Sequence, residues 1–530
     1  TALREADREA DQADAAPLVA APTVQTAEAA RVALDAPRAR SPADRVGADA
    51  AAQPSRAGRA VPHHPLTRVA ENERLHAYES RVKQGFARIV PTLKAISARR
   101  DAEDFVSWAQ AQAQRQLGFE LPERILADAW IDGLDLRALF AQATFETFRQ
   151  ASHAHFASSP LAVLGEVGAF QAFLADCGFH EMNVTPCADG RLAHAVSYVL
   201  RLPPGGVRRK AYAGALFDVE EAVHRWSSVE VGRLRGAEPD PVAAPTRYLK
   251  VAIYHFSSLD PASHGCAAHG SDTRRAATAA LERLDAFRQA IENSFCCGAS
   301  IDTLLLGIDT DTDALRVHLP DATGRIEIER GVDAAELYVE TAHLEPDAAR
   351  AAIRARVGAA GVSRRAAGPH EGLLRLAARL VENNLSQIDY VLTHHGDRYP
   401  DQGHEERFIG VGTDFTDVQL RNLTYFAFMR TVEEGGADLD VGIRIFRRLY
   451  VAHGLPIPIV VRCEYPGQVP GARERAVQRC RRIAAAIAAR YPDLAEKGLL
   501  HTYLTVRDSQ GSGPAECVGS SIPGWGGPVS

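Results

Sequence analysis

A thiol, a carboxylate and a guanidinium stand at alternate positions in the stretch Cys-Ala-Asp-Gly-Arg at 187–191. This stretch directly follows a short run of mainly apolar residues that ends at Pro186. A second apolar run ends at His255, and Cys266 lies in the loop beyond it. Thiolate and imidazole are preferred ligands of Zn²⁺, and a site with three protein ligands keeps one position open for catalysis. Cys187, His255 and Cys266 therefore predict a catalytic zinc site.

The elements that must position these ligands are short buried strands. The apolar runs 182–185, 248–254 and 303–308 are strand-like, and helical patterns alternate with them. This alternation predicts an α/β domain with a largely parallel sheet. In such sheets ligands bind beyond the carboxyl ends of the strands, which is where Cys187 and His255 fall.

Two other arrangements of thiol or metal chemistry remain open at this point. His264, Cys266 and His269 offer a local cluster, although their spacing matches no regular zinc pattern. Another hypothesis is that the chain is a redox protein that uses the thiol of Cys187 or the adjacent thiols of Cys296 and Cys297. The lack of any Cys-x-x-Cys disfavours it, and adjacent cysteines form a disulfide only with strain.

Composition limits the class of protein. The chain has 530 residues, a net charge of −7 and eight irregularly spaced cysteines. We expect several domains, free thiols in a reducing cytosol, and no nucleic acid as a partner, because phosphate binding needs a concentrated basic face. We expect no membrane partner and no export, because apolar runs of the lengths needed for a membrane span or a signal peptide are missing.

The pattern of apolar residues divides the chain into four parts. Residues 1–65 contain no Phe, Trp or Tyr, so we predict a disordered, low-complexity tail. Residues 66–160 carry apolar side chains at three- and four-residue spacing, which predicts an all-helical domain for packing or assembly. Residues 161–402 form the predicted zinc-binding catalytic α/β domain, and residues 403–530 form another α/β domain.

The last domain repeats the order of elements of the one before it, which indicates a duplicated unit. The matching pairs are 407–411 with the strand before Cys187, 457–462 with 251–254, 473–490 with 274–293, and 499–506 with 302–308. Setting Val460 against Val251 aligns Glu464 with His255 and the stretch 412–416 with 187–191, so that no cysteine corresponds to Cys187. We therefore predict a degenerate second copy without a metal site.

These residues together resemble a known family. The Cys-x-Asp-x-Arg stretch followed by a His and a Cys is similar to the zinc signature of the β-class carbonic anhydrases. In that class the His and the second Cys are normally close together, whereas here the ten residues 256–265 separate them. This spacing, the helical domain in front and the degenerate copy behind resemble the carboxysome shell carbonic anhydrases, or ε-class, over roughly residues 70–530.

The resemblance implies roles for the residues of the stretch. Cys187, His255 and Cys266 would bind Zn²⁺ with water at the open position, Asp189 would accept a hydrogen bond from that water, and Arg191 would pair with Asp189. Two thiolates offset the charge of Zn²⁺, so a carboxylate must help to acidify the water. A forked pair with Arg191 would keep Asp189 ionised and away from the metal. The alternative for Asp189 and Arg191 is an ordinary loop salt bridge.

Two further expectations concern the same site. Gly190 is expected to permit the tight turn that brings Asp189 and Arg191 to one side. His394, His395 and His404 are candidates for carrying the proton, because imidazole titrates near neutral pH.

The resemblance also implies an activity and partners. The activity would be that of a zinc lyase that interconverts bicarbonate and CO₂ inside a carboxysome and supplies ribulose bisphosphate carboxylase. Shell proteins or that carboxylase would bind the tail, and the chain would form a homodimer or higher homo-oligomer. The alternative function is a non-catalytic assembly protein that links shell and cargo. A fourth protein ligand, the mark of a structural zinc site, would favour it.

Overall fold

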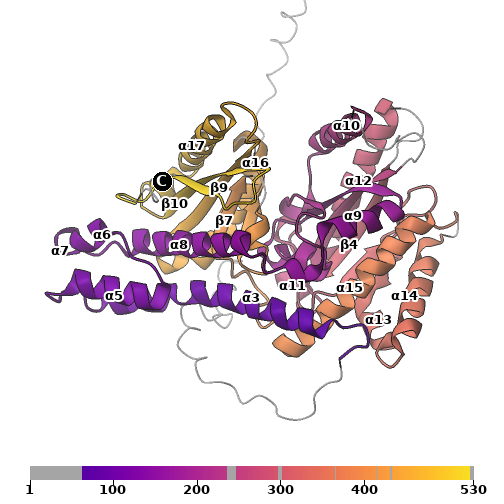
Figure 1. The fold of residues 1–530 in the computed structure, drawn as a ribbon, viewed down its shortest axis with the longest axis horizontal. Coiled ribbons are helices and arrows are strands. Elements are labelled where there is room, and N and C mark those ends of the chain that lie inside the picture. The colour runs from indigo at the N-terminus through magenta and orange to yellow at the C-terminus, as the bar shows by residue number, and fades with distance from the viewer. Residues whose placement is uncertain are drawn as a thin grey trace, which may run out of the picture. The chain divides into compact units, whose positions relative to one another are not determined.

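The computed structural model describes residues 63–235, 246–295, 301–363, 366–412, 415–429 and 432–525. They form a helical region followed by two α/β units, each with its own sheet (Figure 1). The fold class expected from the sequence is therefore confirmed. The predicted tail lies outside the described residues except for 63–65, where His63 bonds to Asp389 and His64 to Thr341. Cys296 and Cys297 also lie outside them.

The helical region consists of α3 (Val69–Ala87), α4 (Ile89–Ser97), α5 (Phe105–Leu117), α6 (Glu123–Ala127), α7 (Ala129–Asp132) and α8 (Leu136–Ala157). Asp135 caps α8, because its carboxylate accepts hydrogen bonds from the backbone N–H groups of Arg137 and Ala138 at 3.1 and 3.0 Å. Such bonds satisfy amides that have no partner within the first turn of a helix.

The first α/β unit contains a six-stranded sheet in the order β2-β1-β3-β4-β5-β6. Its strands are β1 (Phe179–Pro186), β2 (Arg208–Arg209), β3 (Arg247–Phe256), β4 (Ile301–Asp309), β5 (Leu315–His318) and β6 (Val332–Asp333). Strands β1 to β4 are mutually parallel, whereas β5 and β6 are antiparallel additions at one edge. The expectation of a largely parallel sheet holds for the strands that carry the site.

Helices connect and cover these strands. They are α9 (Val167–Asp176), α10 (Val219–Arg235), α11 (Pro261–His264), α12 (Thr273–Phe295), α13 (Ala334–Thr341), α14 (Pro346–Gly361) and α15 (Glu371–His395). The helix α12 joins the parallel neighbours β3 and β4 and packs against both of them. A helical crossover of this kind is required between adjacent parallel strands.

The second α/β unit has the same strand topology. Its sheet order is β8-β7-β9-β10-β11, built from β7 (Phe408–Gly412), β8 (Thr424–Ala427), β9 (Ile457–Tyr465), β10 (Leu500–Asp508) and β11 (Glu516–Ser520). Strands β8, β7, β9 and β10 are parallel and β11 is antiparallel, as are their counterparts β2, β1, β3, β4 and β5. The helices are α16 (Val432–Leu449), α17 (Ala472–Arg490) and α18 (Pro492–Ala495). The two sheets are thus consistent with a repeated unit.

The strand ends show what the repeat has lost. His255 and Glu464 are each the penultimate residue of their strand, β3 and β9, as the sequence alignment predicts. Glu464 forms an ion pair with Arg507 at 2.9 Å, where the other unit carries an imidazole. The strand registers make Gly412 the counterpart of Pro186, which corrects the sequence alignment of Gly412 with Cys187 by one residue. The counterpart of Cys187 is therefore Thr413, which is outside the described residues.

The helical region shares one hydrophobic core with the second α/β unit and with some residues of the first, including Ala188, Tyr198 and Tyr390, while the remainder of the first unit has a separate core. Aromatic contacts carry this packing: the ring of Phe145 stacks on Tyr503 at 5.4 Å, and Phe148 meets Phe408 edge-on at 5.2 Å. A buried ion pair between Arg201 and Glu71 at 2.9 Å links α3 to the first unit. The helical region therefore contacts both units.

Within the described part of the chain, no single helix is both long and apolar enough to cross a bilayer. The bent pair formed by Leu136–Ala157 and Ala162–Asp176, with an angle of 44°, meets the length and composition criteria together.

Candidate metal centre

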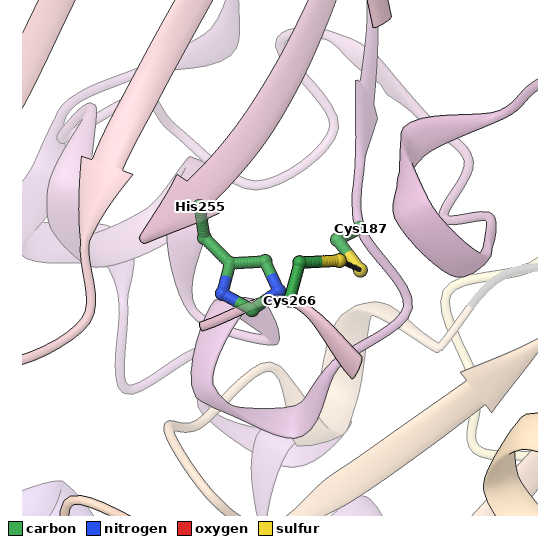
Figure 2. Close-up of side chains that lie close together, drawn as sticks. All are labelled: Cys187, His255 and Cys266. Atoms are coloured by element: carbon green, nitrogen blue, oxygen red, sulfur yellow. Dashed lines mark hydrogen bonds between the residues drawn. The ribbon is translucent and has the colours of Figure 1, made fainter. Parts of the chain in front are cut away.

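Three ligand-type side chains meet at the carboxyl ends of two neighbouring strands (Figure 2). Cys187 follows β1, His255 stands at the end of β3, and Cys266 comes from the loop after β3. The parallel register pairs Pro186 with Ile253, so the residues that follow emerge side by side. All three side chains are buried, and their ligand atoms lie within 4.8 Å of one another.

The spacing of the sulfur atoms fits a tetrahedral metal. The Sγ atoms of Cys187 and Cys266 are 3.9 Å apart. Two Zn–S bonds of about 2.3 Å at a tetrahedral angle would place the sulfurs about 3.8 Å apart. The donor set of two thiols and one imidazole is therefore arranged as zinc requires.

The imidazole of His255 gives an independent indication. It is 0% exposed, and neither Nδ1 nor Nε2 has a hydrogen-bond partner. Buried polar atoms are normally bonded, so a buried ring with two unsatisfied nitrogens calls for a ligand that the protein does not supply. A metal ion bound at one of these nitrogens fits this observation.

The two thiols also require a cation. The adjacent Cys266 sulfur and burial raise the pKa of the Cys187 thiol well above its ordinary value. Two neighbouring buried thiolates repel each other, so both ionise only when a positive charge lies between them. The backbone N–H of Gly214 donates to the Cys187 sulfur at 3.2 Å, which orients that sulfur.

Asp189 and Arg191 form a buried, forked ion pair beside the cluster. Arg191 Nε lies 3.0 Å from Asp189 Oδ1 and Nη2 lies 2.7 Å from Oδ2. Burial alone would raise the pKa of Asp189, but Arg191 and, to a lesser degree, His404 and His255 hold it well below the ordinary value. Asp189 Oδ2 is 3.5 Å from His255 Nε2, so the ionised carboxylate stands at the edge of the cluster.

Arg191 also ties together the segments that frame the cluster. Its Nη1 donates to the backbone carbonyls of His264 and Gln402 at 2.6 and 3.2 Å, and its Nη2 donates to Gly265 at 3.2 Å. His264 and Gly265 immediately precede Cys266. One guanidinium therefore orients the carboxylate and also anchors the loop that carries the second sulfur.

The reason for a glycine at position 190 differs from the expected one. Gly190 is not among the residues with positive φ, so backbone freedom in a tight turn does not explain it. A Cβ atom at this position would lie 2.2 Å from Glu406 Cγ. The backbone N–H of Gly190 donates to Glu406 Oε1 at 3.0 Å, so glycine is needed for the close approach of this carboxylate.

The second α/β unit holds the Cys-x-Asp-x-Arg stretch from the other side. The backbone N–H of Asn422 donates to Gly190 O at 2.9 Å, and that of Phe426 donates to Ala188 O at 3.2 Å. Sequence reasoning missed these residues and Glu406. Glu406 precedes a buried strand, and nothing in its local pattern distinguishes it from an exposed acidic residue.

Of the three histidines proposed as proton carriers, the structure brings one to the cluster. His404 Nε2 is 3.8 Å from Asp189 Oδ2, and His404 Nδ1 is 2.9 Å from Glu406 Oε1. His394 stacks on His76 of α3 at 4.1 Å, and His395 packs against Tyr399 at 4.6 Å. His394 and His395 thus serve the packing of α15.

The alternative local cluster is not formed. His269 Nε2 contacts the carbonyl of Gly214 at 3.2 Å, and His264 lies near Asp260 on a partly exposed helix. Asp189, His404 and Glu406 form the other group of ligand-type atoms found among the described residues. The guanidinium of Arg191 already neutralises Asp189, which disfavours a second cation there.

Fold and site together define an α/β protein with two similar sheets and a group of three side chains in the first unit that could hold a metal ion. The chain matches the family models for the N-terminal (64–156), catalytic (169–404) and C-terminal (405–522) parts of Carboxysome Shell Carbonic Anhydrase. It is similar to carboxysome shell carbonic anhydrases from Prochlorococcus marinus strain MIT 9313 (53% identity over 87% of this chain and 90% of the relative) and Parasynechococcus marenigrum strain WH8102 (54% over 87% and 79%). A third such relative, from Halothiobacillus neapolitanus, is 45% identical over 86% of this chain and 90% of its own. The chain belongs to the carboxysome shell carbonic anhydrase family.

Gly190→Ala tests the packing of the stretch against Glu406. The added methyl group overlaps the Glu406 side chain, so we expect a loss of about 1–3 kcal/mol of unfolding free energy and a lower zinc content. Gly168→Ala is the control, because a Cβ there meets no atom within 4 Å and alanine favours the helix. Urea unfolding and metal analysis measure both variants, and equal stability of the two would contradict the packing argument.

Proposed function

We propose that this chain is a zinc-dependent carbonic anhydrase that interconverts CO₂ and bicarbonate inside a carboxysome. The family membership supports the reaction and the compartment. The main support for a bound metal is that Cys187, His255 and Cys266 converge, with sulfur atoms 3.9 Å apart. The His255 imidazole has no hydrogen-bond partner among the described residues.

Cys187, His255 and Cys266 would hold the metal. When bound there, Zn²⁺ acidifies a water molecule and so supplies the nucleophile for CO₂ hydration at neutral pH. Asp189 is ionised and accepts a hydrogen bond from the reacting water. Arg191 holds both oxygens of Asp189, which aims the carboxylate and keeps it from moving into the ligand set.

The proton released by the reaction needs an acceptor near Asp189. His404 lies between Asp189 and Glu406, and it is the member of the three proposed histidines placed for this role. Glu406 accepts from the His404 ring and from Gly190, so it fixes the imidazole relative to the Cys-x-Asp-x-Arg stretch.

The number of ligands favours catalysis over a purely structural metal. The group at Cys187, His255 and Cys266 contains three ligand-type side chains within the described residues. Structural zinc sites normally have four protein ligands, whereas catalytic sites keep one position for water or substrate. This favours the enzyme over the assembly protein with structural zinc.

We further propose that the CO₂ supplies ribulose bisphosphate carboxylase. Residues 1–65 would bind that carboxylase or shell proteins, and residues 66–160, 161–402 and 403–530 would be the helical, catalytic and degenerate domains. The family context and the inactive second copy support these assignments.

A homodimer or a higher homo-oligomer is the assembly we propose, and light scattering would test it.

Replacing either cysteine should release the metal. Cys187→Ser and Cys266→Ser remove a thiolate ligand, so we expect less than about a tenth of the wild-type zinc content and no measurable CO₂ hydration. Cys177→Ser is the matched control, since Cys177 is a buried thiol outside the site. Elemental analysis and stopped-flow assays give the two readouts. Full zinc occupancy in both ligand variants would refute the assignment.

Asp189→Asn should separate catalysis from metal binding. The amide cannot take up a proton or remain charged, so we expect kcat/KM at neutral pH to fall roughly 100-fold, while zinc content stays near one per chain. Stopped-flow CO₂ hydration and elemental analysis on the same preparation measure this. Unchanged turnover with zinc retained would show that Asp189 and Arg191 form only a loop salt bridge.

Deleting residues 1–60 tests the role of the tail. All residues of the proposed zinc centre lie outside this segment, so we expect the truncated chain to keep its CO₂ hydration activity. Co-sedimentation with purified ribulose bisphosphate carboxylase or with shell proteins should be lost. If the truncated chain still co-sediments like the full chain, the tail is not the binding segment.

A further inference from the structure

Lys250 is a buried lysine that the proposed zinc chemistry does not use. It lies in the middle of β3 and is 4% exposed. Its Nζ atom is 2.5 Å from Asn183 Oδ1 and 2.8 Å from Thr185 Oγ1, both on the neighbouring strand β1. The centroid of the Phe217 ring is 4.3 Å away.

The partners of Lys250 do not require it to be charged. Within the described residues, the ion pairs formed near it join other groups: Lys210 with Glu221, and Arg208 and Arg225 with Glu181. Asn183 and Thr185 are neutral and accept hydrogen bonds equally well from an amine. Burying an ammonium group without a counter-ion is costly, so the neutral form is favoured.

Burial lowers the pKa of Lys250 to about 7, so near neutral pH much of it is a free amine. A neutral amine that donates one hydrogen to Asn183 and the other to Thr185 still has its lone pair available. Lysines at the surface stay protonated at this pH and are poor nucleophiles.

Lys250 also lines a cavity. The cavity has a volume of about 590 Å³ and extends from Lys250 and Phe217 to Phe426 and Phe428 of the second α/β unit. It is large enough to admit a small molecule such as CO₂, which is the substrate or product of a carbonic anhydrase.

We propose that Lys250 is a carbamylation site that binds CO₂ covalently. The lone pair of Nζ attacks the carbon of CO₂ and forms an N–C bond. One C–O π bond opens and its electron pair moves to oxygen, while the amine gives up a proton to the buffer. The product is a carbamate, and the step needs no oxidant, reductant or further co-reactant. Carbonic anhydrase activity enters only as the local source of CO₂.

The surroundings suit the carbamate that would form. The Thr185 hydroxyl can donate as well as accept, and rotation of the Asn183 amide presents its NH₂ group to the new carboxylate. The same cavity is lined by Arg209, whose guanidinium lies over the Phe426 ring at 4.6 Å. Carbamylation would therefore place a negative charge in the cavity shared by the two α/β units.

Chemical trapping tests the proposal directly. The full chain is incubated with ¹³C-labelled CO₂ and bicarbonate, treated with triethyloxonium to esterify carbamates, digested and analysed by mass spectrometry. We expect a ¹³C-ethoxycarbonyl group on Lys250. Lys250→Arg should remove this label, and Lys210→Arg should retain it, because Lys210 lines the same cavity but pairs with Glu221.

Asn183→Asp provides a second variant that leaves Lys250 in place. A carboxylate in contact with Nζ should raise the pKa of Lys250 by at least about one unit, so the free-amine fraction at pH 7, and the labelling with it, should fall at least about fivefold. Labelling of wild-type Lys250 no greater than that of the exposed Lys94 would overturn the proposal, as would unchanged labelling in Asn183→Asp. CO₂ is added directly, so an inactive zinc centre would not by itself prevent labelling.

Discussion

Two buried sulfur atoms 3.9 Å apart, next to an imidazole that has no hydrogen-bond partner among the described residues, are the constraint on which the rest of the site depends. The neighbouring Cys266 sulfur and burial raise the pKa of the Cys187 thiol, whereas the hydrogen bond with Cys187 lowers the pKa of the Cys266 thiol. The two thiols therefore do not readily ionise together without a nearby cation. The parallel register of β1 and β3 supplies Cys187 and His255 side by side, and the long loop after β3 brings in Cys266. Arg191 then fixes this loop by bonding to the two carbonyls that precede Cys266. The fold thus brings together a set of side chains that could hold a metal ion.

The second α/β unit supports the candidate metal centre directly. Glu406, Asn422 and Phe426 all bond to the backbone between Ala188 and Gly190. Glu464 forms an ion pair with Arg507 at the strand position where the first unit has His255. The helical region shares its core with this second unit and with a few residues of the first, among them Ala188 and Tyr198. The second unit therefore contributes to the candidate site by binding the backbone of the Cys-x-Asp-x-Arg stretch.

The sequence predicted the local features of the site better than its long-range contacts. The buried runs ending near Cys187 and His255 are strands with the expected ends, and the duplicated order of elements is confirmed, because apolar periodicity is a local property. The approach of Glu406 to Gly190 spans 216 positions and leaves no pattern at either residue. For this reason glycine was correctly singled out but explained by turn geometry instead of close contact. His404 could be proposed as a candidate, yet only the fold separates it from His394 and His395.

Buried arginines show how the parts of the chain are held in register. Arg191, Arg201 and Arg462 are nearly inaccessible, and each meets a carboxylate: Asp189, Glu71 and Asp417 respectively. Buried ion pairs add little net stability, because desolvation offsets most of the attraction, but an unpaired partner is strongly destabilising. Each pair therefore adds little to the stability of the native fold, but it strongly destabilises any alternative packing in which one partner is left unpaired. The pair of Arg201 with Glu71 fixes α3 relative to the first unit, and the pair of Arg462 with Asp417 fixes elements within the second unit. Arg191 does the same at the candidate metal centre, where it fixes the Asp189 carboxylate beside the three ligand-type side chains.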